Sequence, residues 1–171
     1  RTMSEGRLAF SWTNNDPYLR GSMLAYPFEW LEASYQYVDI NNALYSNVPE
    51  FSGGQTYKDK SFVIKIKILS EENFFADVAL GARDLAGTGV FGSDFLVATK
   101  AFGNLDISLG LGWGNLSADK LSNPLAKISD RFLSRGDIGG NSMGGEFNLD
   151  SFFSGPASIF GGIEYRIPNL H

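Results

Sequence analysis

Charged side chains recur at alternate positions in several stretches of the chain. In SFVIKIKIL (61–69), Lys65 and Lys67 alternate with isoleucines, and in LDISLGLGWG (105–114) Asp106 lies on the parity opposite to Leu, Ile and Trp. Successive side chains of a β-strand point to opposite faces of the sheet. These stretches therefore predict strands with one apolar face and one face of charged and small groups.

The charged residues of these polar faces form the candidate site. They are of both signs, so in the narrow interior of a barrel we expect them to form ion pairs, because an isolated charge there is costly. The predicted network lining that interior consists of Arg7, Arg20, Glu32, Lys65, Lys67, Asp77, Arg83, Asp94, Lys100, Asp106, Glu164 and Arg166.

Residue types for other chemistry are scarce. The chain has no cysteine and a single histidine, His171, which argues against thiolate or multi-histidine metal sites and against a histidine-based triad. GARDLAGTGVFGS (81–93) is glycine-rich, but it lacks GxGxxG and GxxxxGK[ST] spacing and no helical pattern follows it, so a tight turn is favoured over a phosphate loop. We expect no catalytic residue, no metal and no cofactor.

Composition narrows the class of protein further. The chain has 171 residues, 43% of them hydrophobic, and a formal net charge of −5. An acidic chain without a basic run is a poor nucleic-acid binder. No apolar run approaches the roughly 20 residues of a membrane-spanning helix.

Period-two patterns predict eight strands and little helix. Several of the strands are about 9–11 residues long, the length of a tilted strand that crosses a membrane, whereas strands of soluble proteins average about 5–6 residues. The predicted strands cover residues 7–13, 18–27, 30–38, 61–69, 74–83, 93–102, 105–114 and 157–167.

The predicted connections differ at the two ends of the meander. The long ones, 41–60 and 117–156, fall at the same end, and the connections at the opposite end are all short. Outer-membrane barrels show this asymmetry, although lipocalin-like barrels also have one loop-rich end. The aromatic side chains of Trp12, Tyr37 and Trp113 near strand ends are typical of a membrane-interface belt.

The long connections carry further candidate residues. The loop 117–156 is rich in glycine and contains Phe147, Phe152 and Phe153, so we expect it to fold over or into the mouth of the barrel and to cover those rings. Tyr45 and Tyr57 are candidate glycan contacts, since aromatic faces suit sugar rings, or else ordinary packing residues of their loop.

Three interpretations follow from the pattern. The first is an all-β, antiparallel up-and-down (meander) β-barrel of outer-membrane type, in which residues 1–171 form one barrel of about eight strands or part of a larger one. In it Leu109 and Leu111 face lipid, and Asp106 and Ser108 face inward. The second is a soluble or periplasmic β-barrel that binds a small apolar ligand. The third is an outer-membrane enzyme that acts on lipid or glycan.

Four blocks of the sequence resemble a known family. They are EGRLAFSWTNNDPYLRG, EWLEASYQYVDI, GARDLAGTGVFGSDFLVATKAFGNLDISLGLGWGNL and GPASIFGGIEYRIP, which are similar to the YjbH family of outer-membrane proteins with its WbfB- and GfcD-like members. The resemblance implies a bacterial outer-membrane location, large β-barrels and a non-enzymatic role in export or assembly of exopolysaccharide or capsule. It also implies membrane lipid, polysaccharide and other export proteins as partners, and it supplies no catalytic residue.

Overall fold

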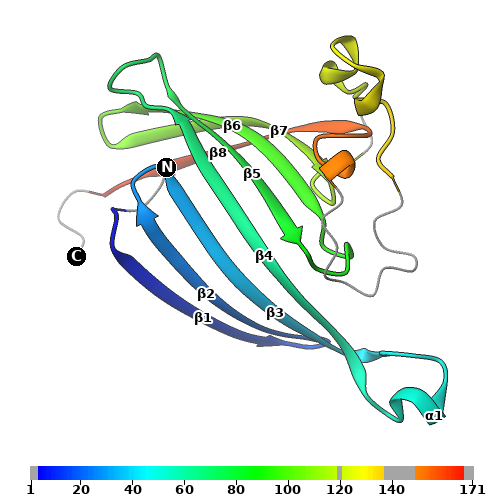
Figure 1. The fold of residues 1–171 in the computed structure, drawn as a ribbon. Helices are drawn as coiled ribbons and strands as arrows, with labels where there is room; N and C mark the ends of the chain where they lie inside the picture. The colour runs from blue at the N-terminus through cyan, green and yellow to red at the C-terminus, as the bar shows by residue number, and fades with distance from the viewer. Residues whose placement is uncertain (1–3, 119–120, 137–148, 168–171) are drawn as a thin grey trace.

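A computed structural model describes residues 4–118, 121–136 and 149–167 (Figure 1). All eight predicted strands are confirmed, and they form one antiparallel sheet in sequence order. The strands are β1 (Arg7–Asn15), β2 (Tyr18–Phe28), β3 (Leu31–Leu44), β4 (Thr56–Leu69), β5 (Asp77–Leu85), β6 (Ser93–Phe102), β7 (Leu105–Gly114) and β8 (Ala157–Tyr165). The helical segments are α1 (Pro49–Ser52), η1 (Pro124–Lys127), η2 (Asp130–Phe132) and η3 (Leu149–Ser151).

The sheet is strongly curved but open (Figure 1). Among the described strands, β1 pairs with β2 alone and β8 pairs with β7, with one additional bridge between Leu121 and Ala157. The predicted meander is therefore present, whereas these strands do not close into a barrel by themselves. No helix within the described ranges is long and apolar enough to cross a membrane.

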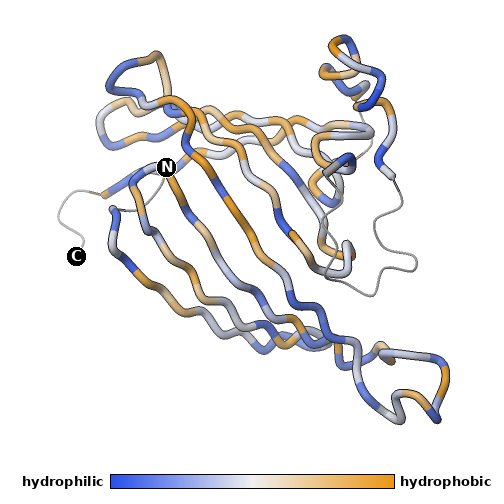
Figure 2. The backbone as a smooth tube through the Cα atoms, in the orientation of Figure 1, coloured by the Kyte–Doolittle hydropathy of each residue, from blue (hydrophilic) through white to orange (hydrophobic). Residues whose placement is uncertain are grey.

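One side of the sheet, here called the apolar face, carries large hydrophobic side chains that remain exposed. Phe10, Met23, Tyr35 and Phe62 are successive cross-strand partners and make a row across β1 to β4. The alternation of hydrophobic and polar residues along the strands is visible in Figure 2. The exposed large side chains of the apolar face include Leu8, Phe10, Trp12, Met23, Tyr35, Phe62, Ile64, Leu96, Ile107, Leu109, Ile159, Ile163 and Tyr165.

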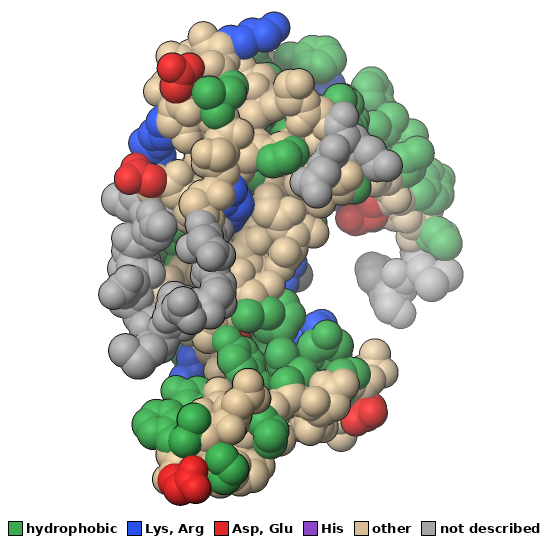
Figure 3. Space-filling view, turned by 90° about the vertical axis from the view of Figure 1, so that its right-hand side faces the viewer, with side chains coloured by type: hydrophobic (Ala, Val, Ile, Leu, Met, Phe, Trp, Pro, Cys, Tyr) green, Lys and Arg blue, Asp and Glu red, His purple; other side chains and the backbone are tan. Residues whose placement is uncertain are grey.

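The opposite side, the polar face, is the concave one. Ser11, Ser22 and Gln36 are cross-strand partners on β1 to β3, and all three line a hollow together with residues of β5 and β6. Figure 3 shows the molecule hollowed in this way. The prediction for β7 holds in that Leu109 is exposed on the apolar face while Asp106 is buried on the polar face.

The predicted loop 41–60 is shorter than expected. Strands β3 and β4 are each 14 residues long, and they extend as a hairpin beyond the rest of the sheet, so that α1 and a few flanking residues form the connection (Figure 1). The extension consists mainly of polar residues such as Asn41 and Lys58. Hydrophobic and polar residues no longer alternate regularly there, although the backbones of β3 and β4 remain paired.

The predicted face assignment of β6 is wrong. We expected Asp94 and Lys100 on the polar face, but their cross-strand partners on β7 are Trp113 and Ile107, which belong to the apolar parity. Directly opposed residues of paired strands point to the same side. Both parities of β6 are largely apolar, so its own sequence does not distinguish the two faces.

Candidate functional site

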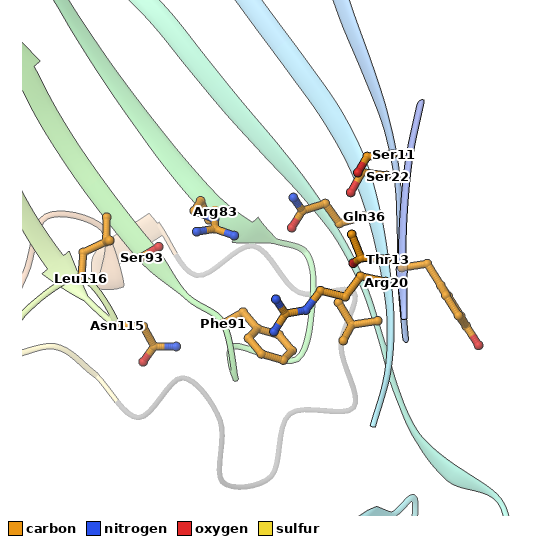
Figure 4. A pocket seen from close by; sticks show the side chains of 12 residues that line it. Ser11, Thr13, Arg20, Ser22, Gln36, Arg83, Phe91, Ser93, Asn115 and Leu116 are labelled. Atoms are coloured by element: carbon orange, nitrogen blue, oxygen red, sulfur yellow. The ribbon is translucent and has the colours of Figure 1, made fainter. Parts of the chain in front are cut away.

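The polar face contains a cavity at the end of the sheet where the long connections lie (Figure 4). Its volume is about 390 Å³. Its walls come from three strands on one side and from β5, β6 and the connections that follow β5 and β7 on the other. The lining residues are Ser11, Thr13, Arg20, Ser22, Gln36, Tyr37, Val38, Arg83, Phe91, Ser93, Asn115 and Leu116.

Phe91 connects the two walls of this cavity. It lies in the connection between β5 and β6, yet its ring makes an edge contact with Tyr18 of β2 at a centroid distance of 6.4 Å. The Arg20 guanidinium lies over the Tyr18 ring at 4.7 Å and over the Phe91 ring at 5.8 Å. Cation–π contacts of this kind hold a guanidinium in a defined place.

Two buried aspartates hold the connection that carries Phe91. Asp59 Oδ1 accepts hydrogen bonds from the backbone N–H and the hydroxyl of Thr88, both at 2.9 Å. Asp84 Oδ2 accepts a hydrogen bond from the backbone N–H of Phe91 at 2.8 Å. Two carboxylates therefore hold the segment RDLAGTG against the cavity wall, and AGTG forms a turn as predicted.

The backbone conformation and the close packing of this turn explain why small residues occupy it. Asp84, Ala86 and Gly89 have positive φ angles of 64°, 55° and 82°. A Cβ atom on Gly87 would collide with the Asp84 carboxylate and lie 2.8 Å from the Ser61 Cβ. Glycine is therefore required at position 87 by close packing.

The members of the predicted network that lie on the polar face divide into two groups. Arg20 and Arg83 line the cavity, whereas the other polar-face members lie nearer the opposite end of the sheet. That second group consists of Arg7, Glu32, Lys65, Lys67, Asp77, Asp106, Glu164 and Arg166.

Two of the predicted ion pairs are present in the second group. Lys65 Nζ lies 3.3 Å from Glu32 Oε2, and an Arg166 guanidinium nitrogen lies 3.0 Å from Asp106 Oδ1. Two further residues of the predicted network, Lys100 on the apolar face and Asp77, have a partner outside the predicted set. Lys100 Nζ lies 2.8 Å from Glu71 Oε1, and Asp77 accepts a hydrogen bond from the Glu71 backbone N–H.

The described parts of the loop 117–156 pack against the end of β6 and β7. Arg135 Nη1 lies 2.7 Å from Asp94 Oδ2, which also accepts a hydrogen bond from the Phe153 N–H. The Phe153 ring covers Trp113, so this tryptophan is buried and does not contribute to an exposed aromatic belt. Phe152 and Phe153 are half-buried, while Phe147 lies outside the described residues.

Tyr45 and Tyr57 lie together at the base of the β3–β4 connection. Their ring centroids are 6.4 Å apart, and Tyr45 stacks on Phe51 at 6.3 Å. They form a small aromatic cluster away from the cavity lining, as expected for packing residues, and a role in contacting glycan stays a prediction.

Sequence patterns missed Asp59 and Phe91 as builders of the site, and they did not show that Asp84 holds the Phe91 backbone. Asp59 falls in the segment expected to be a loop, and Phe91 reaches a strand far from it in the sequence. The one local signal was the glycine-rich RDLAGTG block, which marks an unusual backbone without showing what it supports.

The fold and cavity define a class: a curved antiparallel β-meander with an exposed apolar face and a polar concave face. The chain belongs to the YjbH family, whose model, described as exopolysaccharide biosynthesis protein YbjH, matches residues 1–171. It is 42% identical over 169 residues to the "Uncharacterized lipoprotein YjbH" of Escherichia coli (strain K12). The match covers 98% of this chain and 24% of that relative's length. No solved structure matches the chain.

Proposed function

We propose that the chain forms part of the wall of an outer-membrane β-barrel that serves exopolysaccharide export or assembly without being an enzyme. The observation that carries this proposal is the apolar face. Phe10, Leu109 and Ile163 are 77%, 64% and 74% exposed, on strands from both edges of the sheet to its interior. A face of this extent needs lipid or a partner to cover it, because water-soluble monomers rarely expose apolar patches beyond a few hundred Å².

The concave face supports the same proposal. It carries serine, threonine, amide and charged side chains, as expected for a surface that lines an aqueous lumen. A soluble barrel that binds an apolar ligand would instead direct its apolar side chains into the hollow.

The open edges support a barrel larger than eight strands. β1 and β8 each have an edge at which the described residues provide little or no pairing. The matched relative has about four times the length of this chain, enough for further strands. Eight strands close to an interior that side chains nearly fill, whereas passage of a polysaccharide needs a wider barrel.

Substitution of neighbouring residues on β7 tests the proposal. Leu109→Arg places a charge on the apolar face, at a cost of about 2–4 kcal/mol near the middle of a bilayer, and we expect it to block membrane assembly. Ser108→Arg places the same charge on the polar face and serves as the matched control, which should assemble. The measurement is the amount of each variant, expressed from its own gene, that resists extraction from the membrane fraction by alkali. Equal assembly of the two variants, or recovery of the wild type in the soluble fraction, would contradict the proposal.

A further inference from the structure

The cavity of the polar face has an unusual charge. Its twelve lining residues include Arg20 and Arg83 but no aspartate or glutamate. Across the whole chain, acidic residues outnumber basic ones by 19 to 14. The cavity is therefore a positive site in an acidic protein.

The two cavity arginines have no carboxylate partner, unlike five other cations of the described structure. Lys58, Lys65, Lys100, Arg135 and Arg166 each lie within 4 Å of a carboxylate oxygen. In residues 4–118, 121–136 and 149–167, Arg20 and Arg83 have no such partner, and both side chains are exposed to the hollow. Figure 4 shows them on opposite walls of the cavity.

The remaining lining is suited to a sugar. Ser11, Ser22 and Gln36 follow one another across β1 to β3, and Ser93 and Asn115 lie on the opposite wall. Hydroxyl and amide groups both donate and accept hydrogen bonds, which matches the hydroxyl groups of a glycan. Phe91 adds an aromatic ring that is fixed by Asp84 and by the contact with Tyr18.

We propose that this cavity binds the carboxylate groups of an acidic polysaccharide, with uronic acid units as the ligand class. Arginine binds carboxylates through two parallel N–H···O hydrogen bonds and keeps its charge at any physiological pH. The Tyr18 and Phe91 rings hold the Arg20 guanidinium, so little of its freedom is lost on binding. That the ligand is a polysaccharide rests on the proposed function, whereas its negative charge follows from the cavity itself.

Binding of defined oligosaccharides tests this inference. The protein purified in detergent is titrated in a calorimeter with an oligogalacturonate and with a neutral maltooligosaccharide of the same length. We expect the oligogalacturonate alone to bind, with an affinity that falls as salt is added. Arg20→Gln and Arg83→Gln should each weaken binding at least tenfold, while Arg20→Lys should retain part of it, because lysine keeps the charge but not the paired hydrogen bonds.

Lys67→Gln provides the matched control. Lys67 lies on the polar face nearer the other end of the sheet, so its loss removes the same charge without touching the cavity. The circular dichroism spectrum and thermal unfolding of every variant establish that it is folded. Equal binding of the neutral oligosaccharide, or an equal loss of affinity in Lys67→Gln, would overturn the inference.

The two proposals fail in different ways. If the protein resides in the membrane but does not bind oligogalacturonate, the assignment of the cavity is wrong and the proposed barrel stands. If the protein binds oligogalacturonate but is water-soluble, the cavity assignment stands and the barrel proposal is wrong. Inorganic phosphate serves as a competitor, and full displacement of the sugar by phosphate at equal concentration would show a general anion site and contradict the choice of carboxylate sugars.

Discussion

At the scale of single residues, buried carboxylates determine the shape of the cavity wall. Asp59 and Asp84 both accept backbone hydrogen bonds from the turn that carries Phe91. Asp59 is fully buried, so it has no bulk water to replace a lost partner. Their role is therefore to position Phe91 and, through its ring, Arg20.

Replacement of Asp59 tests this role. Asp59→Ala removes the carboxylate that accepts hydrogen bonds from the N–H and hydroxyl of Thr88, which we expect to destabilise the protein by about 1–3 kcal/mol and to expose the Thr88 amide. Urea unfolding measures the loss of stability, and hydrogen exchange measures the Thr88 amide. Asp130→Ala, at an exposed position, is the control and should change neither. Unchanged exchange at Thr88 in the Asp59 variant would show that this carboxylate does not hold the turn.

At the scale of elements, aromatic rings lie over glycines on neighbouring strands of the polar face. Gly81 faces Phe95 across β5 and β6, and Gly110 faces Phe160 across β7 and β8. A Cβ on Gly110 would lie 2.5 Å from the Phe160 ring and 2.7 Å from the Leu96 carbonyl oxygen. Gly110 in LGLGWG therefore leaves room for the Phe160 ring of the next strand.

A pair of glycine substitutions tests this packing. Gly110→Val should destabilise the sheet by about 1–3 kcal/mol, because the added atoms displace a ring and crowd the backbone. Gly162→Val is the control on the same face, since a Cβ there meets nothing within 4 Å. Thermal unfolding in detergent compares the two variants. A Gly162 variant as unstable as the Gly110 variant would mean that strand propensity, and not the ring contact, determines the effect.

Some features of the strands could be predicted from the sequence, and others could not. Alternation of Leu, Ile and Phe was enough to predict all eight strands and the faces of β1 and β7. It failed for β6, where Phe95 and Leu96 are equally apolar and the Phe95 ring lies over Gly81 of β5 on the polar face. It also missed the polar continuation of β3 and β4. The cavity depends on the contact of Phe91 with Arg20, which is distant in sequence and leaves no local pattern.

At the scale of the whole molecule, curvature separates two environments. The apolar face points outward over most of the sheet, and the polar face encloses a hollow (Figure 3). Ion pairs lie toward one end of the polar face, and Arg20 and Arg83 lie at the other. A sheet of this kind is stable only if its outer face is removed from water. The proposed function therefore requires that lipid covers the apolar face.

Spin labels on β7 measure this claim most directly. The chain has no cysteine of its own, so single cysteines can be introduced from position 106 to position 109 and labelled with a nitroxide in the protein reconstituted into lipid bilayers. We expect labels at Ile107 and Leu109 to be accessible to oxygen dissolved in the lipid, and labels at Asp106 and Ser108 to be accessible to a water-soluble nickel chelate. Accessibility without this alternation, or a label at Leu109 that meets the nickel chelate as readily as one at Ser108, would contradict the account.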